Sequence, residues 1–424
     1  MTIILILVAL LSLLLIRVPV AFALGGMGLA LLYIGNFSLL MVPQSILSML
    51  DGFILLAVPL FLLMSNVLLK GGVGKDLFAA VQAWVGHWPG GLAVATIVSC
   101  GVFAAISGSS VATAATIGTV AIPEMISRGY EKKFVYGLLA AGGTLGILIP
   151  PSIPMIVYGF VTEESVIALF LAGIGPGIAL LTLFIVFAMI YSRFFGGHVT
   201  ETAATWYERR QTSIRALPSV SLAMLIIGGI YSGAFTPTEA AAIGFAASLV
   251  ITIFVLRTLS WKKFLEAAHE SMSTTVAILI IIGGAKVFGK AITLYRIPQD
   301  ISAFITQSID TPLVFILVVS VVLLLMGLVF EALSMVIIMT PVLLPAAMAL
   351  GFDPIWFGVF MVIMVECALI TPPVGLNLYV IQAVARSRLG DVARGVTPFL
   401  LIMFGVAALI YIVPDLALYI PFKL

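Results

Sequence analysis

The chain has 424 residues, of which 62% are hydrophobic and 9% are charged, and its formal net charge is +2. Soluble domains carry roughly 25% charged residues, so this composition excludes an ordinary soluble protein and indicates one that is embedded in a lipid bilayer. The small net charge gives no support for nucleic-acid binding. Cys100 and Cys367 both lie in apolar segments, so a disulfide framework is not expected.

The chain begins with apolar segments that are long enough to cross a bilayer as helices, for which about 20 residues are needed. The first segment has no basic region before it and no small-residue cleavage site, so we interpret it as a span rather than a removable signal. Three spans and one amphipathic stretch are predicted here, at Ile3–Ile16, Val18–Gly35, Gly52–Leu69 and Lys75–Trp88.

A longer apolar region, Gly90–Arg128, is interrupted near its centre by Ser107-Gly108-Ser109-Ser110. It is too long for one span, so we predict a helical hairpin over residues 90–128 that enters and leaves the membrane on the same side. Non-helical backbone at such a tip is tolerated only where it is buried in protein or faces water. The hairpin tip is therefore a candidate site.

The next span, residues 134–160, is interrupted by Ile149-Pro150-Pro151-Ser152. Proline removes a backbone donor and clashes with the preceding turn, so two in succession predict a broken helix. A last span near Gly173–Tyr191 completes the first half, residues 1–195. The polar residues 196–215 are predicted to form a cytoplasmic loop.

The second half, residues 216–424, repeats this order of elements. A hairpin is predicted over residues 311–351, with Glu331 and Ser334 near its centre, and a broken helix over residues 357–384, interrupted at Thr371-Pro372-Pro373-Val374. The remaining predictions are three spans, an amphipathic stretch and a closing span, at Ala216–Phe235, Thr238–Leu256, Ser271–Ile292, Ile297–Ser308 and Gly395–Val413.

Helix-breaking residues support a duplication of the chain. A single shift of 222 residues, without gaps, relates four prolines and two glycines of the first half to the second. The pairs are Pro123 and Pro345, Pro150 and Pro372, Pro151 and Pro373, Pro176 and Pro398, Gly129 and Gly351, and Gly173 and Gly395. Broken helices at matching positions of two halves are the best sequence indication of a transport site.

The charges predict the topology. If each hairpin counts as no crossing, each half crosses five times, and an odd number requires the second half to be inverted. With both termini on the periplasmic side, sixteen of the 20 basic residues fall in inner loops, as the positive-inside rule requires. Lys286 and Lys290 are two of the four on the outer side. They lie one turn apart, and we interpret them as a pair that reaches out to the membrane interface.

Two hairpin tips and two proline breaks that meet near the midplane would form a small polar chamber. Freed carbonyl oxygens and the N-termini of half-helices can hold a cation and an anionic substrate together, and Na⁺ prefers oxygen ligands. The predicted Na⁺-binding residues are Ser107, Ser110, Gly146, Ile149, Pro151, Ala368, Thr371 and Pro373. The predicted substrate-binding residues are Ser109, Thr113, Ser152, Glu331, Ser334 and Asn377.

Several of these residues have a simpler interpretation. The serines at the first tip are also typical of close packing between membrane helices. Glu331, an expensive carboxylate inside the membrane, could instead reach outer water, and Asn377 could satisfy freed backbone groups. Glu366 is a coupling or structural candidate that could pair with a basic residue. For Glu239 a coupling role and a capping role, with Thr236 at the helix start, are equally supported.

No motif predicts catalysis. The sequence has no phosphate-binding Walker loop, no cluster of histidines and cysteines with metal-ligand spacing, and no acidic metal-binding motif of a membrane-embedded transferase. We therefore expect a transporter rather than an enzyme, with energy from an ion gradient or another subunit. A channel is an alternative, but two occluding hairpins favour alternating access.

Four motifs resemble the large membrane subunit of TRAP (tripartite ATP-independent periplasmic) transporters. They are Ser107–Thr113 (SGSSVAT), Gly146–Ser152 (GILIPPS), Phe235–Ala242 (FTPTEAAA) and Thr371–Asn377 (TPPVGLN). The resemblance covers essentially the whole chain. It implies an all-α transporter of the ion-transporter superfamily, in the bacterial inner membrane, that is driven by Na⁺ and works by an elevator mechanism. The ion sites at hairpin tips and helix breaks, and an acidic hairpin residue at Glu331, follow the same resemblance.

The resemblance also implies which part of the transporter moves and which partner proteins it needs. Both hairpins and both broken helices would move as a block past a scaffold formed by residues 1–88 and 216–308. A small four-span membrane subunit would enlarge the scaffold, and a periplasmic substrate-binding protein would deliver the solute. The solute would be an organic acid such as a C4-dicarboxylate or sialic acid. The closest rival is a Na⁺/carboxylate symporter that needs no binding protein.

Overall fold

The structure is a computed structural model that describes residues 2–16, 18–195, 202–308 and 311–423. The described residues form helices joined by short turns and contain no strand. The all-helical fold class predicted from the sequence is therefore confirmed. Arg17 and residues 196–201 of the predicted loop lie outside the described residues.

The first half contains a helix at each predicted span, one additional helix, and a pair of helices on either side of the predicted hairpin tip and of the predicted break. Its opening helices are α1 (Thr2–Leu15), α2 (Val20–Ile34), α3 (Met41–Leu50), the 3₁₀ turn η1 (Phe53–Leu56), α4 (Ala57–Lys70) and α5 (Val73–Val85). The hairpin consists of α6 (Gly91–Ser107) and α7 (Ser110–Ser127). The broken helix consists of α8 (Lys132–Leu148) and α9 (Ile153–Thr162), and α10 (Val166–Phe195) follows.

The second half has the same order of elements. It opens with α11 (Trp206–Tyr231), α12 (Pro237–Val250), which continues into the π-helical turn η2 (Ile251–Val255), α13 (Trp261–Leu294) and α14 (Ile297–Ser308). Its hairpin is α15 (Pro312–Met326) and α16 (Ala332–Ala349), and its broken helix is α17 (Pro354–Ile370) and α18 (Leu376–Ala385). The last helices are α19 (Leu389–Ile412) and α20 (Asp415–Lys423).

Helix caps explain where the predicted bounds differ. The predicted loop 196–215 was wrong in its last ten residues, because Thr205 and Glu208 form a capping box that starts α11 at Trp206. Ser260 caps α13, which therefore begins ten residues before the predicted Ser271. Helices α3 and α20, which are short at 10 and 9 residues, were not predicted from the sequence.

The two proline breaks have the same backbone geometry. Ile149 ends α8 with φ −82° and ψ 123°, and Thr371 ends α17 with φ −82° and ψ 124°. Because these extended angles stop a helix in the same way, the broken-helix pattern read from the prolines is present in both halves. The inverted relation of the halves stays a prediction.

The contacts between helices are exchanged between the halves. The hairpin helix α7 packs on α18, and its counterpart α16 packs on α9; α8 packs on α19, and its counterpart α17 packs on α10. Each of these contacts between the halves thus has a counterpart in which the two halves exchange roles, as a two-fold relation requires. The opening helices exchange partners too, since α2 packs on α13 and α4 on α12.

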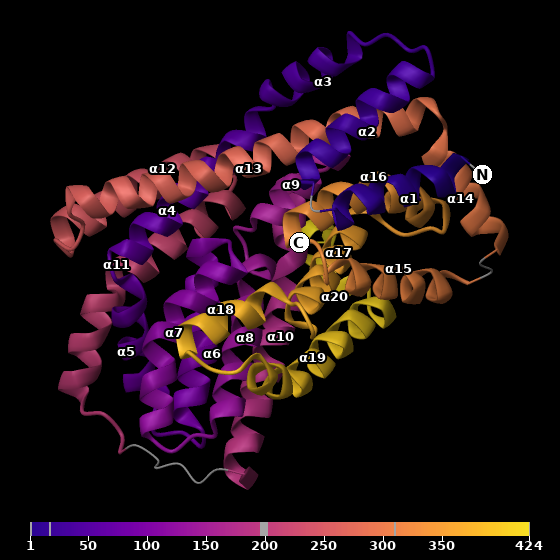
Figure 1. Ribbon diagram of the computed structural model, residues 1–424. Coiled ribbons are helices and arrows are strands. Elements are labelled where there is room, and N and C mark those ends of the chain that lie inside the picture. Colours follow the sequence, from indigo (N-terminus) through magenta and orange to yellow (C-terminus); the bar gives the residue numbers. More distant parts are fainter. Residues whose placement is uncertain (1, 17, 196–201, 309–310, 424) are drawn as a thin grey trace.

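The core lies in the hairpins and broken helices, and the opening helices lie beside it. Every residue of α8 from Phe134 to Leu148 is buried, and so is every residue of α17 from Ile355 to Ile370. In Figure 1, α13 and α2 run side by side along one edge of the molecule, with α6, α7 and α8 grouped further down. Phe22, Met224 and Met272 on α2, α11 and α13 are at least 65% exposed, as expected of helices that face lipid.

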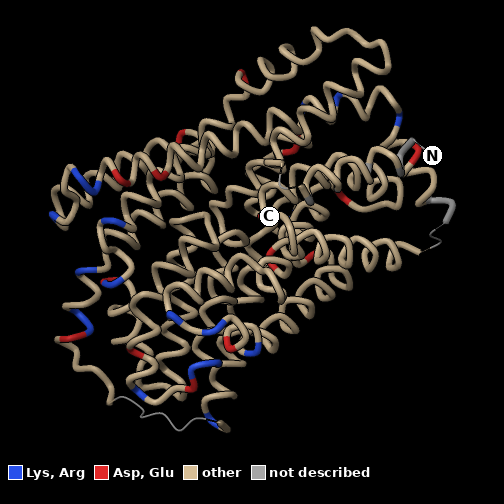
Figure 2. The backbone as a smooth tube through the Cα atoms, in the orientation of Figure 1, with Lys and Arg blue, Asp and Glu red and all other residues tan. Residues whose placement is uncertain are grey.

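Within the described residues, eight helices are long and apolar enough to cross a membrane, or nine if α8 and α9, bent by 40°, are taken as one span. Two of the eight, α7 and α16, belong to the predicted hairpins. Helices α1 and α2 are shorter than 18 residues, the minimum length taken for a span. The number of crossings therefore stays a prediction. Figure 2 shows most lysines and arginines toward the lower left of the molecule, near α5, α11 and the start of α13 and below α6, α7 and α8, which agrees with the predicted charge asymmetry.

Candidate functional site

Polar atoms converge at the tip of the first hairpin. The hydroxyls of Ser107 and Thr113 lie 2.8 Å apart. The Thr113 hydroxyl donates to the carbonyl oxygen of Ser109 at 2.8 Å, and the Ser107 hydroxyl donates to the same oxygen at 3.3 Å. The Ser107 and Thr113 residues are fully buried. Three oxygens from both sides of the tip thus lie within hydrogen-bond distance of one another.

The first proline break presses against this tip. Gly108 has a φ of +61°, and a Cβ there would lie 2.7 Å from the carbonyl oxygen of Pro151. A Cβ at Gly146 would lie 2.5 Å from the carbonyl oxygen of Ser109 and 2.8 Å from the hydroxyl of Thr113. Only glycine fits at either position, because any other side chain would collide with these oxygens. The break and the tip are therefore one packed unit.

Hydroxyl and carbonyl oxygens are the ligands that hard cations prefer. The tip supplies them from Ser107, Ser109 and Thr113, and the carbonyl of Pro151 lies against Gly108 of the same tip. We call Ser107, Ser109 and Thr113 the first-tip oxygen cluster. It is chemically suited to a Na⁺ ion, which would replace the hydrogen bonds that the hydroxyls now make with each other.

The other predicted residues of the first half lie around the cluster. Ser110 is buried and lines a central cavity. Ser152 caps α9, since its hydroxyl accepts from the backbone nitrogen of Met155 at 3.3 Å. The Ile149 side chain packs close to Gly101 and Gly177 on α6 and α10, so only its backbone belongs to the break.

The tip of the second hairpin presents a carboxylate instead of hydroxyls. Glu331 immediately precedes α16, and with the buried Ser334 it lines a cavity of about 490 Å³. Val374 and Leu376 of the second break line the same cavity. The structure therefore brings the second tip and the second break together, as the sequence predicts.

The three predicted Na⁺-binding residues of the second half differ in what they offer. Ala368 packs against Gly327, where a Cβ would lie 2.3 Å from the Ala368 Cβ. The Thr371 hydroxyl donates to the carbonyl of Cys367 at 2.6 Å, and Pro373 is exposed. The described residues show no second group of hydroxyls like the first-tip oxygen cluster.

Glu366 and Asn377 are buried without a hydrogen-bond partner. Glu366 is 1% exposed and Asn377 is fully buried, and the polar side-chain atoms of both lack a partner in the described structure. Neither residue lines the cavities at the two tips. A buried polar group without a partner is costly, so Glu366 remains a coupling candidate and Asn377 a binding candidate.

A central cavity of about 360 Å³ joins the two halves. Ser109 and Ser110 line it from the first tip, Glu331 lines it from the second, and both breaks contribute apolar residues, Ile153 and Leu376 among them. Its volume is in the range of sites that bind small molecules. Glu331 is the only charged residue among the described residues that line it.

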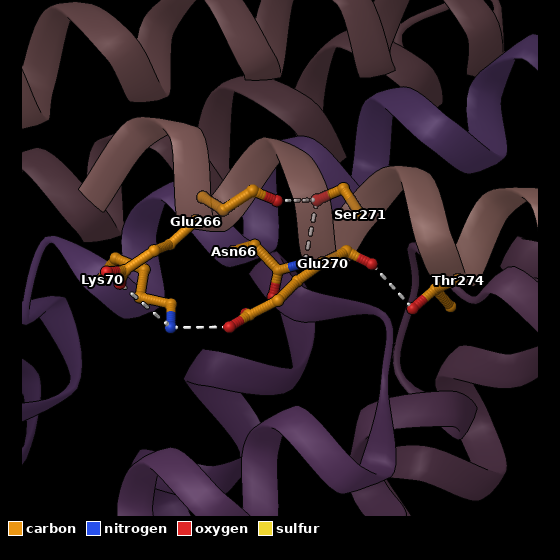
Figure 3. A network of polar contacts seen from close by, with 7 residues as sticks. Asn66, Lys70, Glu266, Glu270, Ser271 and Thr274 are labelled. Carbon is orange, nitrogen blue, oxygen red and sulfur yellow. Dashed lines mark hydrogen bonds and ion pairs between the residues drawn. The ribbon is translucent and has the colours of Figure 1, made fainter. Parts of the chain in front are cut away.

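The opposite wall of the central cavity comes from α4 and α13, and its polar residues were not predicted from the sequence. Ser65, Asn66 and Thr274 line this wall. The Asn66 amide donates to Ser271 at 2.8 Å, and nearby Lys70 donates to Glu270 at 2.8 Å (Figure 3). The Ser65 hydroxyl is buried and has no hydrogen-bond partner in the described structure, so it is free to meet a ligand.

Glu239 lies in a capping box at the start of α12. The Thr236 hydroxyl accepts from the Glu239 backbone nitrogen at 3.3 Å, and the Glu239 carboxylate accepts from the Thr236 nitrogen and hydroxyl, both at 2.9 Å. The Thr236 hydroxyl and one carboxylate oxygen of Glu239 are thus used to begin the helix. The geometry favours the capping interpretation, and a coupling role for Glu239 stays a prediction.

Thr236→Ala is expected to destabilise the protein by about 1 kcal/mol without changing transport per folded molecule, because it removes the cap but no cavity residue. Thermal unfolding in detergent checks the stability. Thr182→Ala is the matched control, since Thr182 is exposed within α10 and caps no helix. Loss of transport in Glu239→Gln with unchanged stability would contradict a purely capping role.

Comparisons with known proteins bear on this arrangement. The family described as "Tripartite ATP-independent periplasmic transporter, DctM component" matches residues 7–416. The chain is 40% identical over 375 residues to the C4-dicarboxylate TRAP transporter large permease protein of Pseudomonas aeruginosa, covering 88% of this chain and 87% of that one. It is 35% identical over 415 residues to the sialic acid TRAP transporter large permease protein of Vibrio cholerae, covering 97% and 96%.

A solved structure shares the fold. The YdaH transporter of Alcanivorax borkumensis, described as having an unusual topology, superposes with a TM-score of 0.61 over 91% of this chain and 89% of that one. The sequence identity is 15%, so this likeness concerns the fold alone.

Proposed function

Because the chain belongs to the TRAP transporter family as its DctM component, the large permease of a tripartite system, we propose that it takes up an organic acid on a Na⁺ gradient. As a member of this family with many apolar helices, it is a multi-pass protein of the inner membrane. The solute class follows the two relatives, whose names give a C4-dicarboxylate and sialic acid.

One observation carries the proposal. The central cavity is lined by both hairpin tips and both proline breaks, and the first-tip oxygen cluster lies beside it. A site of this kind can hold a hard cation next to an anionic solute, so that each reduces the cost of binding the other. Coupled binding of two ligands is the requirement for symport.

The proposed movement is an elevator. Helices α6–α9 and α15–α18 would carry the cavity, and α1–α5 and α11–α14 would stay fixed. The central cavity lies between these groups, with α4 and α13 forming its fixed wall. Sliding of one group past the other would open the cavity to alternate sides of the membrane while its lining residues stay together.

The proposed partners are a small four-span membrane subunit and a periplasmic substrate-binding protein. The family description names a tripartite periplasmic system of which this chain is one component. The exposed apolar faces of α2, α11 and α13 give the small subunit a surface within the bilayer. The binding protein would meet the outer side and release the solute there.

The test is uptake into proteoliposomes that contain the chain with its small subunit. Uptake is measured with and without the binding protein, and with and without an inward Na⁺ gradient, over a panel of organic acids that includes succinate and sialic acid. We expect uptake of one acid that requires both the protein and the gradient. Uptake that requires only Na⁺ would instead indicate a stand-alone symporter, and non-saturable flux that requires neither would indicate a channel.

A further inference from the structure

Another polar cavity, of about 510 Å³, lies beyond the central one toward the side that is predicted to be the outer side, and we call it the outer cavity. Helix α3 lines it with Ser45 and Ser48, α13 lines it with Lys286 and Lys290, and α16 lines it with Ile337 and other apolar residues. Helices α3 and α13 of the proposed fixed group therefore face α16 of the proposed moving group across this cavity. The lysine pair, interpreted from the sequence as reaching out to the membrane interface, lines this cavity, with Lys286 half-buried and Lys290 exposed.

The two lysines are the only charged residues among the described residues that line this cavity. Lys286 lies over the ring of Phe160, with its nitrogen 4.6 Å from the ring centroid. No described carboxylate oxygen lies within 4.0 Å of either lysine nitrogen. Charged residues on a membrane helix are expensive and mark ligand pathways when they face a cavity. Here the charge is positive, and no carboxylate of the described residues lies within ion-pair distance of it.

The cavity lies on the line along which the second hairpin would move. Helix α13 lines the central cavity at Thr274 and Ile278 and the outer cavity from Ile282 to Thr293, while α16 runs the same way, from Glu331 at the central cavity to Pro341 at the outer one. Ile337 and Pro341 lie six and ten residues beyond Glu331, which is about 9–15 Å along a helix. A slide of that length would bring the second tip level with the lysines.

We propose that Lys286 and Lys290 form a fixed anion site that receives the carboxylate of the solute when the hairpin tips face outward. This inference rests on the proposed function for the identity of the anion. The two lysines are four positions apart in sequence, which is about 6 Å along the helix, so together they suit a small carboxylate or dicarboxylate. The positive pair raises the local concentration of anions on the outer side and accepts the solute before the tips enclose it.

The charge of the cavity is tested by the labelling of a single cysteine. Ser48→Cys places a thiol in the outer cavity, and the two native cysteines are fully buried. Its reaction rate is measured with an anionic reagent, 2-sulfonatoethyl methanethiosulfonate, and with a cationic one, 2-(trimethylammonium)ethyl methanethiosulfonate. We expect the anionic-to-cationic rate ratio to fall about tenfold in the Lys286→Gln/Lys290→Gln background. Lys262→Gln, on the same helix near its other end, is the matched control and should leave the ratio unchanged.

The identity of the anion is tested with the same thiol in vesicles of phosphatidylcholine. Succinate at millimolar concentration should slow labelling by the anionic reagent, and the double lysine variant should lose this protection. An unchanged rate ratio in the double variant would overturn the anion site. Protection that requires added phosphatidylglycerol and not succinate would overturn the carboxylate assignment, because it would show a lipid headgroup site.

The labelling does not depend on transport, so the two proposals can fail separately. Charge-dependent labelling without Na⁺-driven uptake would count against the proposed function alone. Na⁺-driven uptake with an unchanged Michaelis constant in the lysine variant, and no charge effect on labelling, would count against the lysine site alone. If both hold, the variant should raise the Michaelis constant for the acid at low salt more than it lowers the maximal rate.

Discussion

Gly146→Ala is expected to reduce uptake at least about 100-fold. The new Cβ would lie 2.5 Å from the Ser109 carbonyl oxygen and 2.8 Å from the Thr113 hydroxyl, and both atoms belong to the first-tip oxygen cluster. Overpacking a close contact typically costs 1–3 kcal/mol, and here the backbone of the tip must move. The predicted Na⁺ site would be displaced even if the protein stays folded. Initial uptake rates in proteoliposomes, measured over a range of Na⁺ concentrations, check this.

Gly405→Ala is the matched control for this variant. Gly405 lies in α19, is exposed, and a Cβ there would have no neighbour within 4 Å, so alanine should be tolerated and favour the helix slightly. Size-exclusion profiles and melting temperatures separate unfolding from a displaced site. A folded Gly146→Ala protein with wild-type Na⁺ dependence would show that the first-tip oxygen cluster is not an ion site.

The helix breaks could be predicted from sequence because proline and glycine act locally. The hairpin predicted over residues 90–128 is observed as α6 and α7, within a residue at each end, since Gly90 and Gly108 adopt positive φ values that few other residues reach. The break predicted at Pro150-Pro151 ends α8 at Leu148. In each case one or two residues decide the backbone.

The walls of the cavities could not be predicted in this way. Ser65, Asn66 and Thr274 are isolated polar residues in apolar helices, and only the packing of α4 against α13 brings them to one cavity. The same holds for Lys286 and Lys290. The sequence predicts that they lie one turn apart on a helix, but it does not predict that they face α3 and α16. Such sites depend on contacts between helices that are distant in sequence.

The two tips differ in a way that bears on coupling. The first supplies neutral oxygens from Ser107, Ser109 and Thr113, and the second supplies the negative charge of Glu331 to the central cavity. A carboxylate facing a cavity that must accept an anionic solute opposes binding of that solute unless a cation neutralises it. In the proposed symporter this arrangement would make solute binding depend on a bound cation, which is the coupling that symport needs.

Glu331→Gln is accordingly expected to raise the half-saturating Na⁺ concentration for uptake at least about tenfold. The change keeps the shape of the side chain and removes its charge. A tenfold effect requires the loss of only about 1.4 kcal/mol of attraction, which is well within the range for two opposite charges a few Å apart near a protein surface. Uptake rates at fixed solute and increasing Na⁺ measure it. Glu163→Gln, at an exposed glutamate just after α9, is the control.

The outcome also separates the two interpretations of Glu331. If the carboxylate only reaches outer water, the glutamine variant should keep the Na⁺ dependence of the wild type, and the coupling argument fails. If the Glu331 carboxylate holds the cation, the glutamine variant should bind Na⁺ more weakly. Solute binding at low Na⁺ should weaken less than transport does, because the substitution removes the repulsion between the carboxylate and the solute as well as the attraction for the cation. A weaker requirement for Na⁺ in the binding step, combined with slower Na⁺-driven uptake, is therefore the specific signature of a coupling carboxylate.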